Sequence, residues 1–277
     1  MKNNNHNYCL VTLFLFFLCA NTHAAIVDTL NINSKSMSKE VKAVVILPEK
    51  YDKSQQYPVL YLLHGYGGRY DNWVNNVPEV KKLVDTYNYI VVCPDGCVDS
   101  WYWDIQGDNN YQYDTFISGE LPAYIDAHYM TKKERTGRAI TGLSMGGHGA
   151  ITLAIKHQDV YGAAGSTSGG LDIRPFPMNW NIKSRIGTYA THPQEWETRS
   201  AINMVHLLTP NQLELIIDCG KEDFFYNVNL AVHDKLDYYN IPHTFITRAG
   251  AHNWDYWSKS IVYQMAFFHD FFNKKHS

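Results

Sequence analysis

Ser144 lies in the segment TGLSMGGHGA (residues 141–150), which places glycines two residues before and two residues after the serine. A serine hydroxyl attacks a carbonyl carbon only when a base takes its proton, and it must project from the backbone toward the substrate. The pentapeptide GLSMG (142–146) is typical of a sharp strand-to-helix turn, in which glycines remove the Cβ atoms that would clash. The spacing therefore predicts Ser144 as a nucleophile.

The glycines around this serine also allow other interpretations. A glycine-rich helix start without chemistry is the simplest, because short matches of this kind arise by chance. A phosphate-binding loop would require Lys and then Ser or Thr after the last glycine, and a dinucleotide site would require Gly-x-Gly-x-x-Gly; neither pattern is present. The strand-like residues 137–142 and the helical apolar spacing of 145–158 favour the strand–turn–helix interpretation.

His252 is the histidine best placed to act as a base. It follows the last predicted strand (243–250) and precedes the final helix, and ligands of an open parallel sheet lie beyond the carboxyl ends of its strands. We expect a packing role for His148, one turn into a helix, and a loop-shaping role for His64. His243 precedes a strand and is expected on the opposite side of the sheet.

The acid that orients this imidazole should come from LELIIDCGKEDFFY, which offers three carboxylates. Asp218 is still within the predicted strand, whereas Asp223 lies three residues past Gly220, on the loop. Glu222 is next to it and is expected to point elsewhere. Asp223 is therefore the predicted partner of His252, and the chain order Ser, Asp, His is the one expected for this architecture.

An oxyanion hole needs backbone N–H groups aimed at the developing negative charge, each worth roughly 3–4 kcal/mol. We predict the N–H of Met145, directly after the nucleophile, as one donor. The second should come from the loop HGYGG after an early strand, and we predict the N–H of Tyr66. An ordinary glycine turn is the alternative for that loop.

These residues need a scaffold, and the chain alternates between buried strands and amphipathic helices. Continuous Val/Ile/Leu runs that end in Gly or Asp indicate strands covered on both faces. Strands alternating with helices predict an α/β fold, with a mostly parallel central sheet and helices on both faces. We expect one domain over 25–277, with an insertion over a sheet edge at about 171–210. The predicted strands are 41–51, 57–68, 88–96, 137–142, 213–220 and 243–250, and the predicted helices are 78–88, 114–129, 145–158, 227–240 and 255–272.

Composition narrows the class of protein. The chain has 277 residues, of which 45% are apolar and 18% charged, and its net charge is −3. This charge gives no basic surface for nucleic acid and no attraction to anionic membranes. Residues 1–24 resemble a cleaved signal peptide whose apolar run is too short to span a bilayer, which takes about 20 residues. We therefore expect a periplasmic or secreted protein without a stable membrane span.

Three cysteines remain after the predicted signal: Cys93, Cys97 and Cys219. Their odd number rules out a fully paired disulfide framework, and their spacing is not a zinc pattern. Cys93 lies in an apolar run, where a buried small hydrophobic side chain is expected. A disulfide between Cys93 and Cys97 is the alternative.

The assembled motifs resemble the esterase D / putative-esterase family of α/β-hydrolases, which includes S-formylglutathione hydrolases, feruloyl and acetyl xylan esterases of carbohydrate esterase family 1, and the antigen 85 mycolyltransferases. The segments that carry the resemblance are VVILPEKYD, YPVLYLLHGYGG, VVCPDG, SWYWD, ELPAYID, TGLSMGGHGA, IDCGKEDF and GAHNWDYW. The resemblance implies the α/β-hydrolase fold, with Ser144, Asp223 and His252 as the triad. It also implies Tyr66 and Met145 as the oxyanion hole, and a reaction without a metal or cofactor.

Tryptophans near the predicted site bear on the substrate. Trp101, Trp103 and Trp254 are expected at the mouth of the site, where their rings could stack on a sugar or a phenolic acid; packing against the loop is the alternative. Trp180 and Trp196 in the insertion could form a lid or a sugar platform. We expect a secreted esterase acting on feruloyl or acetyl esters of plant polysaccharide, or on similar small esters. An acyltransferase to a sugar hydroxyl and a non-catalytic carbohydrate-binding relative are the alternatives.

Overall fold

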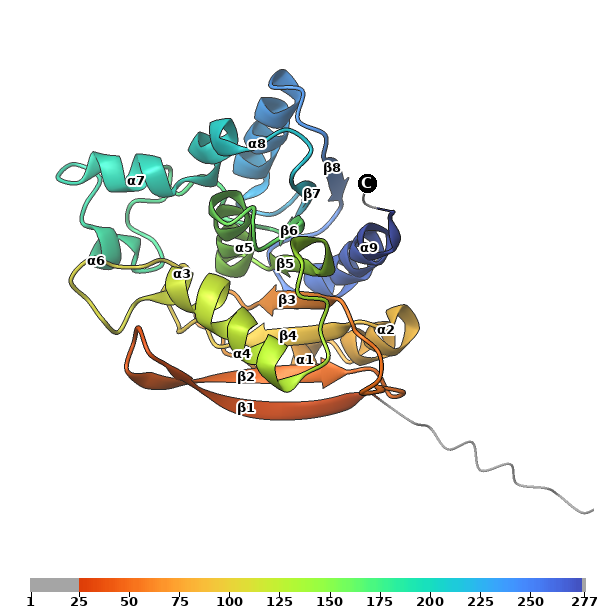
Figure 1. The fold of residues 1–277 in the computed structure, drawn as a ribbon. Coiled ribbons are helices and arrows are strands. Elements are labelled where there is room, and N and C mark those ends of the chain that lie inside the picture. The colour runs from red at the N-terminus through yellow and green to blue at the C-terminus, as the bar shows by residue number, and fades with distance from the viewer. Residues whose placement is uncertain (1–24, 276–277) are drawn as a thin grey trace, which may run out of the picture.

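The protein is built around an eight-stranded sheet (Figure 1). The structure is a computed structural model that describes residues 25–275. The predicted signal peptide lies outside the described residues. The strand order is β1-β2-β4-β3-β5-β6-β7-β8, and only the pairs β1–β2 and β2–β4 are antiparallel. The mostly parallel sheet predicted from the sequence is therefore confirmed. The strands are β1 (Ile26–Ser34), β2 (Lys39–Leu47), β3 (Val59–Leu63), β4 (Ile90–Pro94), β5 (Arg138–Gly142), β6 (Ala163–Thr167), β7 (Glu214–Gly220) and β8 (Thr244–Arg248).

The central strands are buried on both faces, which explains their continuous apolar sequences. Successive side chains of a strand point to opposite faces. In β3, Val59, Tyr61 and Leu63 pack into one hydrophobic core. Leu60 and Leu62 of the same strand pack into a second core on the other face. One apolar pentapeptide thus contributes to two helix–sheet interfaces.

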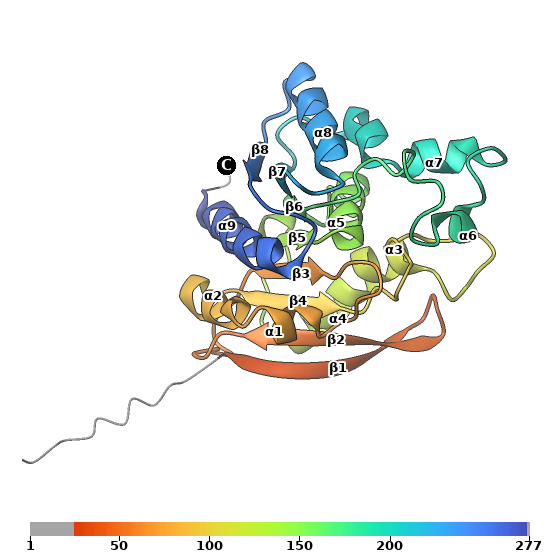
Figure 2. The same cartoon turned by 180° about the vertical axis from the view of Figure 1, so that it is seen from behind.

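Helices form a layer on each face of the sheet, as Figures 1 and 2 show from opposite sides. Residues of α1, α2 and α9 build one core, and residues of η1, α4, α5, η3 and α8 build the other. Within residues 25–275, no helix is both long and apolar enough to cross a bilayer. The helices are α1 (Asn72–Asn76), α2 (Glu79–Tyr87), α3 (Tyr113–Thr115), η1 (Phe116–Glu120), α4 (Leu121–His128), η2 (Arg135–Gly137), α5 (Met145–Lys156), α6 (Ile182–Ile186), α7 (Pro193–Arg199), η3 (Ala201–Leu207), α8 (Tyr226–Tyr238) and α9 (Trp254–Asn273).

Two strands were not predicted from the sequence. β1 is an edge strand whose outward side chains are largely exposed, and it forms because all nine of its residues pair with β2. β6 has the sequence AAGST, which carries little strand propensity, yet it is fully buried between β5 and β7. In both strands, pairing with a neighbour outweighs local sequence preference.

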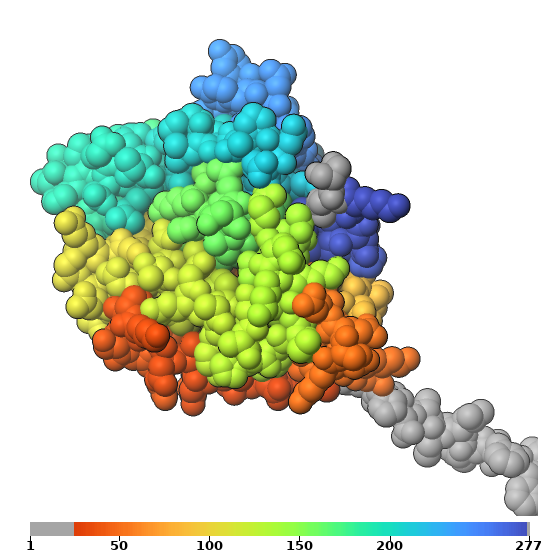
Figure 3. All heavy atoms as spheres, in the orientation of Figure 1, coloured from red at the N-terminus to blue at the C-terminus, as the bar shows by residue number. Residues whose placement is uncertain are grey.

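The inserted segment 171–210 contains α6, α7 and η3 and packs mainly on the helix layer. Its η3 contacts both α5 and α8. In Figure 3 its teal surface lies beside the yellow loop that follows β4. An ion pair joins the two, with Arg185 Nη2 2.6 Å from Asp99 Oδ2.

The turn between β5 and α5 brings two backbone segments very close together. A Cβ atom on Gly146 would lie 2.5 Å from the His64 carbonyl oxygen and 2.7 Å from that of Leu63. A Cβ atom on Gly142 would lie 2.7 Å from the Leu63 carbonyl oxygen. The two glycines of the motif are therefore required because α5 begins against the backbone at the end of β3.

This contact predicts that Gly146→Ala destabilises the fold. Both clashing atoms are backbone oxygens that cannot rotate away, so we expect a loss of about 1–3 kcal/mol of unfolding free energy, measured by urea denaturation. Gly119→Ala is the matched control, because a Cβ atom there would meet nothing within 4 Å. Equal stability of the two variants would contradict the close approach.

Candidate active site

Ser144 occupies the bend between β5 and α5 in a strained backbone conformation. Its φ is 55° and its ψ is −118°, values that a residue with a side chain rarely adopts. The bend is held by main-chain hydrogen bonds from Ser144 N to the Thr167 oxygen at 2.9 Å and from Leu143 N to the Leu63 oxygen at 3.3 Å. The surrounding sheet thus maintains a conformation that an isolated chain would avoid.

Three predicted side chains meet at this bend in a hydrogen-bonded row. Ser144 Oγ lies 2.9 Å from His252 Nε2. His252 Nδ1 lies 2.8 Å and 3.0 Å from the two carboxylate oxygens of Asp223. A carboxylate can only accept, so Nδ1 carries the proton and the lone pair of Nε2 faces the serine hydroxyl. This arrangement can take the proton of Ser144 and hold the resulting imidazolium beside a negative charge.

Asp223 is fully buried, with 0% of its side chain exposed, whereas 15% of the His252 side chain is exposed. It lies in the loop after β7 and also accepts a hydrogen bond from Phe225 N at 2.8 Å. The ring of Phe224 packs over the imidazole, with 4.2 Å between the ring centroids. Water is therefore excluded from the carboxylate, which strengthens its interaction with His252.

The other two carboxylates of this region have different partners. Asp218 lies within β7, where Arg248 Nη2 donates to it at 3.0 Å and Tyr256 also donates its hydroxyl. Glu222 accepts a hydrogen bond from the Gly250 amide. Neither contacts the imidazole. The structure thus places Asp223 beside His252 and assigns Asp218 to a buried ion pair between neighbouring strands.

His64 and His148 are buried and have structural partners, as expected. Gly96 N donates to His64 Nε2 at 2.7 Å, and Trp103 Nε1 donates to His148 Nε2 at 3.0 Å. The Nδ1 atom of each ring therefore carries the proton and donates to a carbonyl oxygen. Burial lowers the pKa of His148 to about 4 and also lowers that of His64. Both rings are thus neutral supports for the loops around Ser144.

The predicted oxyanion-hole residues flank the serine. Met145 is the first residue of α5, where the amides of the first turn have no acceptor within the helix. Tyr66 lies in the loop after β3, which is held by hydrogen bonds from Gly67 N to the Val98 oxygen and from Gly68 N to the Gly65 oxygen. A Cβ atom on Gly65 would lie 3.2 Å from Ser144 Cβ, so the loop that contains Tyr66 passes directly beside the Ser144 bend.

A cavity of about 590 Å³ opens over Ser144 and His252. Its walls are rich in aromatic rings from four separate segments of the chain. Half of the Phe224 surface and more than a third of that of Tyr66 remain exposed. The lining residues are Gly65, Tyr66, Gly67, Gly68, Asn72, Leu143, Ser144, Trp180, Phe224, His252, Asn253, Trp254 and Trp257.

The tryptophans divide into two groups. Trp254 lines the cavity and packs edge-on against Trp73. Trp101 and Trp103 are each only 1% exposed and pack edge-on against His148, so the expectation that they form the mouth of the site is wrong. The chain turns back at Trp101 and Tyr102, whose φ values are 54° and 61°, and both tryptophan rings pack into the core that α5 covers.

In the insertion, Trp180 reaches the cavity and Trp196 does not. Trp180 stacks on Phe224 with ring centroids 5.6 Å apart, which brings the insertion next to the imidazole. Trp196 is fully buried and donates its ring N–H to the Gly187 oxygen, so it cannot form a sugar platform. Phe224 was not singled out from the sequence, although its position directly after Asp223 could have indicated it.

The three cysteines of the described chain are all free thiols. Cys93 and Cys219 are buried, and burial raises the pKa of each thiol well above its usual range. Cys97 is half-buried beside Tyr111 and Asp99. Cys93 is thus the buried small side chain expected from its apolar run, and it has no disulfide bond to Cys97.

The chain is similar to several known esterases. The model of the family described as "Putative esterase" matches residues 34–268. An acetyl esterase from Caldicellulosiruptor saccharolyticus is 25% identical over 253 residues, which cover 84% of this chain and 94% of the relative. An S-formylglutathione hydrolase from Bos taurus is 28% identical over 224 residues, or 74% of this chain and 77% of the relative. A solved structure of a ferulic acid esterase superposes with a TM-score of 0.79 at 26% identity, covering 90% of this chain and 99% of that chain.

Proposed function

Because the chain belongs to the "Putative esterase" family and is a carboxylic-ester hydrolase, we propose that it cleaves esters through an acyl-enzyme on Ser144. The observation that carries this proposal is the hydrogen-bonded row of Ser144, His252 and Asp223 at the end of the parallel sheet. In this assignment, Ser144 is the nucleophile and His252 is the general base. Asp223 orients the imidazole and stabilises its charged form.

The first half-reaction follows from the distances at the site. His252 Nε2 takes the proton from Ser144 Oγ, which attacks the ester carbonyl carbon and forms a tetrahedral intermediate. The oxyanion accepts hydrogen bonds from the N–H groups of Tyr66 and Met145, and the positive end of the α5 dipole adds to this stabilisation. His252 then gives the proton to the leaving alcohol oxygen as the C–O bond breaks.

Water completes the cycle through the same groups. With the alcohol gone, His252 takes a proton from a water molecule, and the oxygen of this water attacks the acyl carbonyl carbon. The second tetrahedral intermediate collapses when Ser144 Oγ regains its proton from His252, and the carboxylic acid leaves. The side chains named here are sufficient for both steps, so the mechanism uses no cofactor.

Phenolic or acetyl esters are the proposed substrates. The cavity over Ser144 has aromatic walls from Tyr66, Trp180, Phe224, Trp254 and Trp257, and such surfaces stack on flat rings. Similarity to an acetyl esterase and to a ferulic acid esterase supports the same two acyl groups. We therefore propose feruloyl esters, with acetyl esters of polysaccharide as the alternative.

We further propose that the protein is exported to the periplasm or the medium. The support is the N-terminal sequence, in which Lys2 precedes an apolar run over residues 9–20 and small residues follow up to Ala24. Export would bring the enzyme to polymer-linked esters, which do not enter the cytoplasm. It also makes glutathione thioesters, which are largely cytosolic, less suitable substrates.

Ser144→Ala should abolish turnover and leave the fold intact. Removing a triad nucleophile lowers kcat by roughly 10⁶-fold, whereas the loss of one hydroxyl at the start of a helix changes the thermal midpoint little. Hydrolysis of p-nitrophenyl acetate measures the first effect, and thermal unfolding followed by circular dichroism measures the second. Turnover within tenfold of the wild-type value would overturn the assignment.

Asp223→Asn and Asp218→Asn should have opposite effects. Asparagine at 223 favours the wrong imidazole tautomer, so kcat should fall about 10³–10⁴-fold with little loss of stability. Asparagine at 218 leaves Arg248 without its buried counter-charge, so stability should fall while kcat of the folded protein at low temperature stays within about tenfold. The test is to measure kcat and the thermal midpoint for both variants. A larger loss of kcat in Asp218→Asn than in Asp223→Asn would contradict the choice of Asp223 as the acid.

A substrate panel of methyl ferulate, acetylated xylan and p-nitrophenyl acetate tests whether the aromatic walls of the cavity bind the substrate. Trp254→Leu should raise KM for methyl ferulate by about 2- to 10-fold, because a ring contact contributes roughly 0.5–1.5 kcal/mol, and leave KM for acetylated xylan, which has no aromatic ring, nearly unchanged. Tyr238→Leu is the control, since this ring is 79% exposed and does not line the cavity. Product transfer to an added sugar in preference to water would instead indicate an acyltransferase.

A further inference from the structure

A second cluster of ionisable side chains lies at the opposite end of the parallel strands. His233 and Asp237 are one turn apart on α8, and His243 follows in the turn that leads into β8. His233 Nδ1 lies 2.7 Å from His243 Nε2. The Asp237 carboxylate lies 3.6 Å from His233 Nε2 and 3.9 Å from His243 Nε2. The active-site residues instead follow the carboxyl ends of the strands, so this His233–Asp237–His243 cluster is separate from them.

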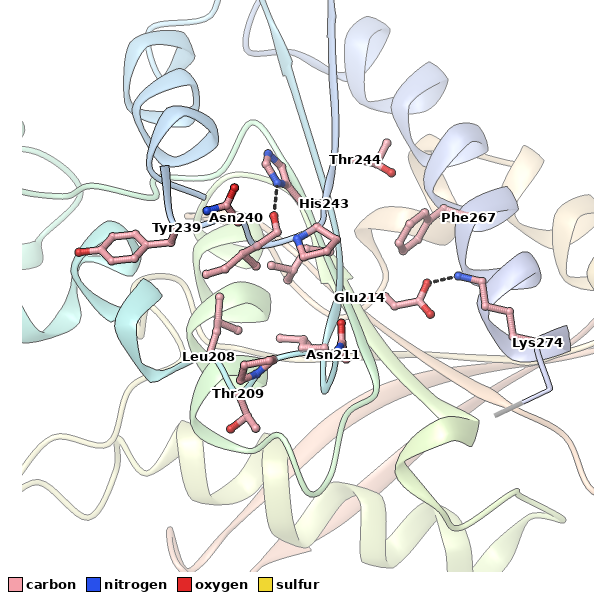
Figure 4. A pocket seen from close by; sticks show the side chains of 15 residues that line it. Leu208, Thr209, Asn211, Glu214, Tyr239, Asn240, His243, Thr244, Phe267 and Lys274 are labelled. Carbon is pink, nitrogen blue, oxygen red and sulfur yellow. Dashed lines mark hydrogen bonds and ion pairs between the residues drawn. The ribbon is translucent and has the colours of Figure 1, made fainter. Parts of the chain in front are cut away.

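The hydrogen bonds of the cluster define where its lone pairs point. His243 Nδ1 lies 2.8 Å from the Ile241 carbonyl oxygen, which can only accept, so the proton of a neutral ring is on Nδ1 (the dashed line at His243 in Figure 4). His243 Nε2 therefore presents a lone pair to His233. Without an ion, His233 donates to this lone pair from Nδ1, 2.7 Å away. An ion that replaces this proton would be held between His233 Nδ1 and His243 Nε2, with the Asp237 carboxylate 3.9 Å from His243 Nε2.

We propose that this cluster binds one divalent transition-metal ion of the Zn²⁺ class. Two imidazole nitrogens and one carboxylate oxygen are a donor set that suits Zn²⁺ and its neighbours, whereas Ca²⁺ and Mg²⁺ prefer all-oxygen sites. One ligand atom from each of the three residues can be chosen so that all lie within 4.8 Å of one another. Tetrahedral bonds of 2.0–2.1 Å need about 3.3 Å between ligand atoms, so the two rings must separate by roughly 0.6 Å.

The surroundings already orient the ligands. The bond from His243 Nδ1 to a backbone carbonyl is the outer contact that metal-binding histidines usually make. Phe245 stacks on the His233 ring with 4.4 Å between centroids and 10° between planes. The His243 side chain is only 3% exposed, whereas that of Asp237 is 63% exposed, which leaves an open approach for the ion. His243 also lines a cavity of about 670 Å³ (Figure 4).

A metal ion at this position would join two segments that support the triad. The helix α8 begins three residues after Asp223, and β8 ends four residues before His252. The ion would tie the far end of α8 to the start of β8 and so close the loop between them. Its effect is therefore on stability, and it takes no part in the reaction at Ser144.

Zn²⁺ titration of the full-length chain, treated with a chelator and then desalted, tests the site. We expect one Zn²⁺ per chain with a dissociation constant of micromolar or lower, and Co²⁺ should give the visible absorption of a tetrahedral site. Asp237→Asn should weaken Zn²⁺ binding at least tenfold and His233→Gln at least 100-fold. The side chains of His233 and Asp237 are 28% and 63% exposed, so neither variant opens a cavity in the core and both should fold.

Asp234→Asn is the matched control, because it makes the same charge change on the same helix at an exposed residue outside the cluster. Zn²⁺ at about 100 times its dissociation constant should raise the thermal midpoint of the wild type and of Asp234→Asn by roughly 5 °C or more. The rise should be less than half as large in Asp237→Asn. Absence of stoichiometric binding, or equal affinity in all three variants, would overturn the proposal, including the case in which Zn²⁺ binds only at His252.

Discussion

The close approach of α5 to the end of β3 is the constraint on which the site depends. Gly146 lies so near the Leu63 and His64 carbonyl oxygens that no side chain fits. This approach allows the chain to reverse within one residue, and that residue is Ser144, held at a positive φ. Backbone strain of this kind costs of order 1–3 kcal/mol and persists only where packing and hydrogen bonds on several sides hold the residue in place. Here the buried central strands hold the bend, because Ser144 N bonds to Thr167 of β6 and Leu143 N bonds to Leu63 of β3.

The rest of the site follows from the topology of the same sheet. In parallel strands all carboxyl ends lie at one edge, so the loops after β3, β5, β7 and β8 converge although their residues are far apart in sequence. Convergence of the loops alone would leave the His252 ring solvated and free to rotate. The aromatic ring of Phe224 covers the imidazole on one side, and the buried Asp223 carboxylate fixes its tautomer on the other. These buried contacts therefore fix the imidazole so that Nε2 faces Ser144 Oγ and can accept its proton.

The two helix layers have different roles around this edge. The layer of α1, α2 and α9 contributes Trp254 and Trp257 to the cavity from the start of α9. The opposite layer carries the insertion, which places Trp180 against Phe224 and is tied to the loop after β4 through the contacts of Arg185 with Asp99 and Tyr111. The walls of the cavity therefore come partly from a core helix and partly from the inserted segment.

The sequence by itself determined the fold class, the strand–turn–helix at Ser144 and the candidates His252 and Asp223. These features rest on local patterns: buried apolar runs, glycine spacing and the position of a residue just after a strand. Tertiary structure decided the rest. β6 forms from AAGST only because its neighbours pair with it, and the insertion lies on α5 and α8 because of contacts between distant residues. Trp101 and Trp254 look alike in sequence, since each lies just beyond the end of a strand. The backbone turn at Trp101 and Tyr102 buries the first ring beside α5, whereas the second ring lines the cavity from the start of α9. The direction of each ring is set by tertiary packing that no local sequence pattern encodes.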